Sequence, residues 1–114
     1  MKSAVIIVGR PNAGKSTTIR EFKTTVTAVS FHEYKIGDKI GYVLSYSFET
    51  RCDVDETINK LSEYDYLLFA SQGEELETMH KVLNKAGFSV NDVNIQRPSD
   101  APEKAKEVLR KFAP

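Results

Sequence analysis

The 114-residue sequence has little of what several classes of protein need. Cys52 is its only cysteine, which excludes an intramolecular disulfide and suits a reducing compartment such as the cytoplasm. Sixteen basic residues balance sixteen acidic ones, so no net charge is available to attract nucleic acid or an anionic membrane. The apolar run at residues 4–8 is too short for a signal-peptide core or a membrane span. We expect a cytoplasmic protein with neither a membrane nor a nucleic-acid partner.

Features that would divide the chain are also missing. No fixed-period repeat, low-complexity tract or linker rich in proline and glycine is visible. The hydrophobic fraction of 40% and the charged fraction of 28% are ordinary for a folded protein. Residues 1–114 are therefore expected to form a single domain with its own core.

Strand and helix patterns alternate along the chain. Residues 4–8 are continuously apolar and mostly β-branched, which is typical of a strand covered on both faces. Further strands are predicted at 66–70 and 90–95, and helices at about 15–23, 53–63, 74–86 and from Asp100 onward. This alternation predicts a three-layer α/β/α sandwich around a mostly parallel five-stranded sheet with one antiparallel edge strand.

The antiparallel strand follows from a hairpin signal. Gly37 and Asp38 separate two strand-like runs, residues 31–36 and 39–47, and such a pair indicates a tight turn. The second run is more hydrophobic, so we place it inside the sheet and the first run at its edge. Residues 24–29 must then carry the chain back across the sheet, yet they are β-branched and look like a strand themselves. The sequence therefore does not decide whether residues 24–29 form a strand or a connection.

A phosphate-binding motif lies between the first strand and the first helix. The sequence Gly-Arg-Pro-Asn-Ala-Gly-Lys-Ser matches G-x-x-x-x-G-K-[ST] at every fixed position. Glycines allow a tight bend whose amides wrap phosphates, and the helix that follows presents free amides and its positive end. Lys15 would reach the β- and γ-phosphates, Ser16 would bind Mg²⁺, and Thr17 would contact the α-phosphate. The predicted loop residues are Gly9, Arg10, Pro11, Asn12, Ala13, Gly14, Lys15, Ser16 and Thr17.

On this motif and the alternation around it, the chain resembles the P-loop NTPase superfamily. Its loop is similar to the G-R-P-N-x-G-K-S-T loop of the Era and Der type GTPases, which implies ATP or GTP with Mg²⁺ as ligands. Two later GTPase-like strings, at residues 38–41 and 84–87, we interpret as turn and capping sequences. Residues 93–100 are similar to the adenine-contacting loop of nucleoside monophosphate kinases. That resemblance implies that Arg97 and Pro98 flank the base, although an ordinary capped loop is the alternative.

The acidic residue that P-loop enzymes add at a neighbouring strand end is not obvious. Glu49 is our candidate for this carboxylate, with a solvated loop glutamate as the alternative. We expect Glu49 to be catalytic together with Lys15 and to bind the metal ion together with Ser16. Gln72, at the end of the strand 66–70, is a further position where ligand contacts are expected. Residues 71–90 contain no arginine-bearing lid, so a closed acceptor site would need a second protein chain.

The sequence therefore leaves three hypotheses for the function. The first is a kinase-like protein that binds ATP and Mg²⁺ and slowly hydrolyses or transfers the γ-phosphate. The second is a reduced GTP-binding switch, favoured by the Gly-Arg-Pro-Asn start of the loop. The third is a nucleotide-binding interaction module without turnover, favoured by the missing acidic strand end.

Overall fold

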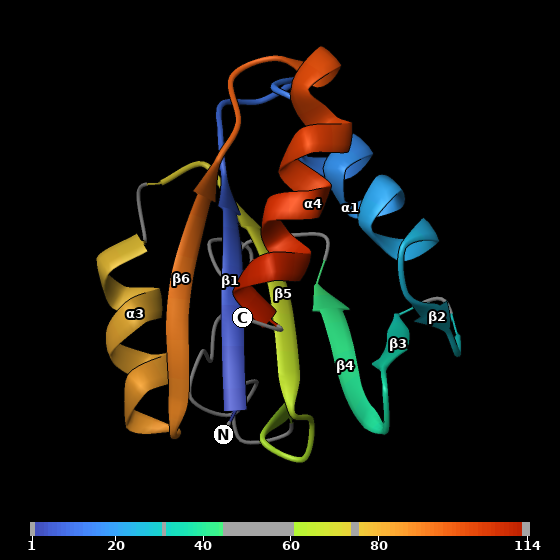
Figure 1. The fold of residues 1–114 in the computed structure, drawn as a ribbon. Coiled ribbons are helices and arrows are strands. Elements are labelled where there is room, and N and C mark those ends of the chain that lie inside the picture. The colour runs from blue at the N-terminus through green and yellow to red at the C-terminus, as the bar shows by residue number, and fades with distance from the viewer. Residues whose placement is uncertain (1, 31, 45–60, 74–75, 113–114) are drawn as a thin grey trace.

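The computed structural model describes residues 2–30, 32–44, 61–73 and 76–112. Within these residues one mixed sheet of six strands runs in the order β2-β3-β4-β5-β1-β6 (Figure 1). The neighbouring pairs β4–β5, β5–β1 and β1–β6 are parallel, whereas β3 runs antiparallel to both β2 and β4. The strands are β1 (Lys2–Val8), β2 (Thr27–Ala28), β3 (Glu33–Ile36), β4 (Lys39–Leu44), β5 (Tyr66–Ser71) and β6 (Phe88–Asn94).

Helices pack on both faces of this sheet. Helices α1 (Lys15–Thr24) and α4 (Ala101–Phe112) share one face, where they bury apolar side chains in one core cluster. Helix α3 (Leu76–Lys85) packs with a second cluster on the other face. Strand β1 supplies both clusters by alternation, since Val5 and Ile7 belong to the first and Ala4 and Ile6 to the second. Its unbroken apolar run is the consequence of being covered on both sides.

The α/β class is confirmed, but the expected number of strands was wrong. The hairpin forms as predicted, with Gly37 at a φ of 66° in the turn between β3 and β4. Residues 31–36 were expected to be the edge of a five-stranded sheet, yet β2 pairs along the outer side of β3. The amides of Val29 and Ser30 both donate to the Glu33 carbonyl, closing a tight turn between β2 and β3. The β-branched segment thus forms its backbone hydrogen bonds with the next strand in the chain.

The helices that fall within the described residues occur where the sequence predicts them. Gly87, at a φ of 94°, ends α3 in the left-handed conformation expected after a helix. A short 3₁₀ turn, η2 (Pro98–Asp100), leads directly into α4. Most of the helix expected at 53–63 lies outside the described residues. Among the helices that are described, none has the length and apolar character needed to cross a membrane.

An unpaired tyrosine hydroxyl lies in the core beneath α1 and α4. The Tyr34 ring is fully buried, 5.0 Å from the Phe22 ring and 6.2 Å from the Phe112 ring. Gly41 lies opposite Tyr34 in the hairpin, where an added Cβ would stand 2.3 Å from the tyrosine ring. The hydroxyl has no hydrogen-bond partner among the described residues, and burial raises the Tyr34 pKa well above its usual value. The hydroxyl is therefore a desolvated group without compensation.

Replacing this tyrosine should not weaken the fold. We expect Tyr34→Phe to leave the free energy of unfolding unchanged or to raise it by about 1 kcal/mol, because an unpaired buried hydroxyl is removed. The matched control is Tyr64→Phe, which removes a hydroxyl that donates to Glu33 Oε2 at 2.9 Å and should cost about 1 kcal/mol. Urea unfolding of both variants measures the difference. A loss in Tyr34→Phe as large as in the control would show that its hydroxyl is bonded in solution.

Candidate functional site

The loop between β1 and α1 lies beyond the carboxyl end of a central strand. β1 is flanked by β5 and β6, both parallel to it, so the carboxyl ends of these strands meet beside the loop (Figure 1). Pairing continues into the loop region, because Gly9 N donates to Ser71 O at 3.0 Å and Ile95 N donates to Val8 O at 2.9 Å. This edge is where open α/β sheets bind ligands.

The loop itself is a compact turn. Asn12 and Gly14 have positive φ angles of 67° and 105°, and Ala13 N donates to Arg10 O at 3.1 Å. The Gly14 carbonyl accepts from Thr18 N and from Thr18 Oγ1, each at 2.8 Å, which closes the first turn of α1. Ser16 and Thr17 lie in the first turn of α1, before this first helical bond. The backbone N–H groups of a first helical turn have no partner inside the helix.

Both glycines of the motif are explained by packing against the segment that joins β6 to α4. A Cβ added at Gly9 would lie 2.7 Å from Ile95 O, and one added at Gly14 would lie 2.6 Å from Pro98 Cα. Ala13, between them in the loop, is buried in the cluster that also contains Ile95. The motif spacing predicts a role for these glycines in phosphate binding, but it carries no signal for their packing against Ile95 and Pro98.

Lys15 curls back over the loop from the start of α1. Its Nζ donates to Gly9 O at 2.6 Å and to Arg10 O at 3.0 Å. The ammonium group therefore lies beside backbone carbonyls of the loop that precedes it. Next to it is a hollow of about 390 Å³ lined by Asn12, Gly14, Lys15, Ser16, Thr17 and Pro98.

A second hollow opens beside the first, where β1, β5 and β6 end. Its volume is about 580 Å³, and its polar side chains are those of Arg10, Gln72, Asn94, Gln96 and Arg97. Gln72 was expected at this edge, whereas Asn94 and Gln96 were missed, since only the pairing of β6 with β1 brings them here. Arg97 also lies near Asp100, with 3.5 Å between Nε and Oδ2.

The predicted site residues thus fall into two groups. Most loop residues, together with Arg97 and Pro98, line the two hollows at one end of the sheet. Pro11 and Ala13 line neither hollow, since Pro11 is exposed and Ala13 is buried in the core. The carboxylate candidate Glu49 lies outside the described residues. Over the described part of the chain, no group of three or more His, Cys, Asp or Glu side chains could hold a metal ion.

Comparison with known proteins adds nothing to this site. No protein-family model, no curated protein and no solved structure matches the chain.

The glycine packing can be tested apart from any ligand. Gly14→Ala and Gly87→Ala both place a side chain at a positive φ, 105° and 94°, so both should pay about 1 kcal/mol of backbone strain. Only Gly14→Ala meets Pro98, while no described atom lies within 4 Å of the Cβ added at Gly87. We expect Gly14→Ala to lose roughly 1–3 kcal/mol more stability in denaturant unfolding. Equal losses would mean that the Pro98 contact yields freely.

Proposed function

We propose that this chain binds a nucleoside triphosphate with Mg²⁺ through the loop between β1 and α1. The observation that carries the proposal is the hollow at the start of α1, where Lys15, Ser16 and Thr17 lie together beside a motif of phosphate-binding spacing. A helix N-terminus attracts anions through its unpaired amides and its dipole, and Lys15 adds a full positive charge. Fold and motif support the same ligand.

Each loop residue then has a separate role. The amides at the start of α1 donate to phosphate oxygens, with Thr17 nearest the α-phosphate. Lys15 exchanges its bonds to the Gly9 and Arg10 carbonyls for bonds to the β- and γ-phosphates. Because both partners of an ammonium–phosphate hydrogen bond are charged, each such bond is stronger than a bond from the same ammonium group to a neutral carbonyl.

Magnesium fits this site through few protein ligands. Mg²⁺ keeps several waters and is commonly held by one or two protein oxygens together with substrate phosphates, so a cluster of acidic side chains is not required. The Ser16 hydroxyl, at the start of α1 and lining the hollow, is the protein oxygen we assign to it. Bound magnesium would neutralise charge on the phosphate oxygens. Glu49 remains our proposal for the carboxylate that orients a metal-bound water.

The fold supports a P-loop arrangement. A central parallel strand leads into the loop, and helices pack on opposite faces of the sheet, as a three-layer sandwich requires. We propose that the chain is a small member of this architecture. The hairpin of β3 and β4 and the additional strand β2 extend it on one side.

The residues of the second hollow are relevant to the reaction that we propose for the bound nucleotide. Its amide side chains can both donate and accept hydrogen bonds, and its two arginines suit an anionic group. We propose slow hydrolysis or kinase-like transfer of the γ-phosphate, with Arg97 and Pro98 beside the base. The alternatives are a reduced GTP switch, favoured by the Gly-Arg-Pro-Asn loop, and binding without turnover. Single-turnover measurements with ATP and GTP distinguish them.

Removing the loop lysine should abolish nucleotide binding. We expect Lys15→Ala to lose triphosphate affinity by about 10²-fold or more in calorimetry with ATP, GTP and Mg²⁺, because the cation facing the phosphates is gone. Lys106→Ala, an equal change of charge at an exposed position of α4, should bind as the parent does. Circular dichroism checks that both variants fold. Unchanged affinity in folded Lys15→Ala would overturn the proposed function.

Ser16 should govern the magnesium dependence rather than binding as such. We expect Ser16→Ala to lower affinity in Mg²⁺ while leaving affinity in excess EDTA nearly unchanged, because a metal ligand is lost. Thr24→Ala, at the other end of α1, removes a hydroxyl that donates to Glu21 O and should change neither value. An equal response of Ser16→Ala in Mg²⁺ and in EDTA would exclude Ser16 as the metal ligand.

A further inference from the structure

The two edges of the sheet differ in how well they are protected. Strand β2 closes one edge with only two residues, Thr27–Ala28. At the other edge, β6 pairs with β1 over seven residues in unbroken register, and no described strand pairs on its outer side. Proteins commonly protect such an edge with lysine, proline or a bulge. The sequence of β6, Phe-Ser-Val-Asn-Asp-Val-Asn, contains neither lysine nor proline.

Alternation along β6 identifies the backbone groups that face outward. Ile95 N donates to Val8 O, so Ile95 points its backbone groups toward β1. Because the direction of these groups alternates along a strand, Val93 and Asn91 also point toward β1. Val90 and Asp92 then direct their N–H and C=O groups away from the sheet. Among the described residues, the outer edge of β6 is therefore a row of backbone donors and acceptors without a pairing strand.

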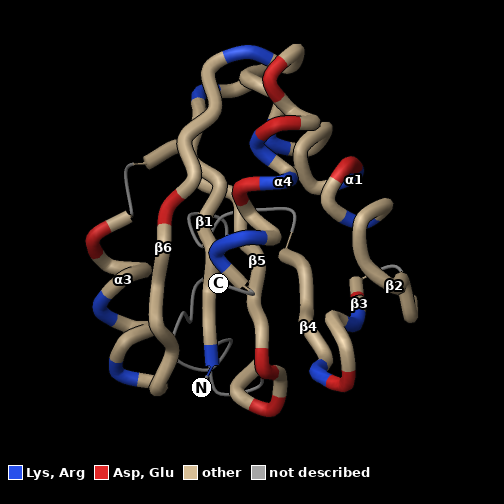
Figure 2. The backbone as a smooth tube through the Cα atoms, in the orientation of Figure 1, with Lys and Arg blue, Asp and Glu red and all other residues tan. Residues whose placement is uncertain are grey.

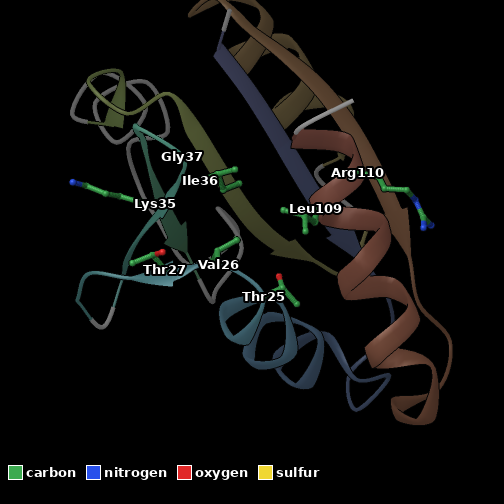
Figure 3. Close-up of a pocket in the computed structure, with 8 residues that line it drawn as sticks. All are labelled: Thr25, Val26, Thr27, Lys35, Ile36, Gly37, Leu109 and Arg110. Carbon is green, nitrogen blue, oxygen red and sulfur yellow. The ribbon is translucent and has the colours of Figure 1, made fainter.

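The charged side chains near this edge lie on the faces of the sheet and not along the edge itself. Asp92 Oδ1 lies 2.8 Å from His80 Nε2, which holds the carboxylate against α3 on one face. On the other face, Asn91 and three residues of α4 line a hollow of about 540 Å³. Figure 3 shows Arg110 pointing away from Leu109, on the opposite side of α4 from the β2–β3 hairpin. The residues of this hollow are Asn91, Glu107, Arg110 and Lys111.

We propose that β6 is a self-association edge, at which β6 of a second copy of this chain adds in antiparallel register centred on Asn91. This register overlaps the whole strand and sets Val90 opposite the partner's Asp92, so that the outward-facing groups of both residues bond. A register centred on Asp92 would instead oppose two carboxylates, which is unfavourable. The two-fold arrangement requires a surface that complements itself.

The charges beside Asn91 meet that requirement. The two-fold axis places the two α4 helices on the same face of the joined sheet, running in opposite directions. Glu107, whose Oε2 lies 3.5 Å from Lys104 Nζ of its own helix, then also faces the basic end of the other α4, which carries Arg110 and Lys111. Figure 2 shows acidic and basic positions following one another along α4. Opposite charges across the axis favour this partner and this register.

This association does not use the β1–α1 loop that we propose binds the phosphates. Antiparallel pairing sends the carboxyl ends of the strands in opposite directions in the two copies. The two β1–α1 loops therefore lie at opposite ends of the joined sheet, and both stay open. Failure of nucleotide binding would leave the edge proposal unchanged, and failure of self-association would leave the nucleotide proposal unchanged.

Charge reversal on α4 tests the pairing directly. Sedimentation equilibrium of the full chain should show a dimer, and Glu107→Arg or Arg110→Glu alone should weaken it by about tenfold or more, since each opposes like charges across the axis. Mixing the two single variants should restore the dimer, because each then faces opposite charge in its partner. Circular dichroism confirms folding. A monomeric parent at high concentration, or single variants that associate as the parent does, would overturn the proposal.

Amide exchange in the same strand locates the interface. In the dimer, the outward amides of Val90 and Asp92 should be protected, and they should lose this protection in the Glu107→Arg variant. The inward amides of Asn91 and Val93, bonded to β1, should stay protected in both proteins and serve as the control. A dimer in which the Val90 and Asp92 amides exchange rapidly would show association through another surface and contradict the assignment.

Discussion

The contact between the β1–α1 loop and the segment from Ile95 to Pro98 is the constraint on which the candidate site depends. Gly9 lies against the Ile95 carbonyl and Gly14 against Pro98, at distances that leave no room for a side chain. These contacts join residues that are far apart in the chain, one group before α1 and the other before α4. They fix the loop relative to the start of both helices, which then pack together on one face of the sheet.

This constraint depends in turn on how β1 is buried. A strand with helices on both faces has no freedom to shift its register, because a slip by one residue would exchange the two core clusters. Val5 and Ile7 are held on one side, and Ala4 and Ile6 on the other. The end of β1 is therefore a fixed point, and Gly9 continues its pairing to Ser71. The loop starts from a rigid position at the edge where three parallel strands end.

Much of this arrangement follows from local sequence, and the rest from contacts that local sequence does not encode. The hairpin at Gly37, the helix end at Gly87 and the buried strands could be predicted, because each rests on a few neighbouring residues. The strand-like character of residues 24–29 could be recognised, but their path could not, because the two residues of β2 pair with β3, the strand that follows them. The place of Asn94 and Gln96 beside the loop was missed for the same reason. The metal-side carboxylate proposed at Glu49 lies outside the described residues, so it remains a prediction.

The packing of the glycines is compatible with the proposed binding of phosphate by this loop. A loop held by Ile95 and Pro98 keeps its shape without a ligand, so less conformational entropy is lost when an anion binds. Lys15 is different, since the Gly9 and Arg10 carbonyls that its Nζ contacts can be exchanged for phosphate oxygens. We propose that a preformed loop with one mobile cation binds a triphosphate with little loss of conformational entropy. The same rigidity would limit how far the loop closes around the γ-phosphate. In the proposed phosphoryl transfer, exclusion of water would then come from elements other than this loop.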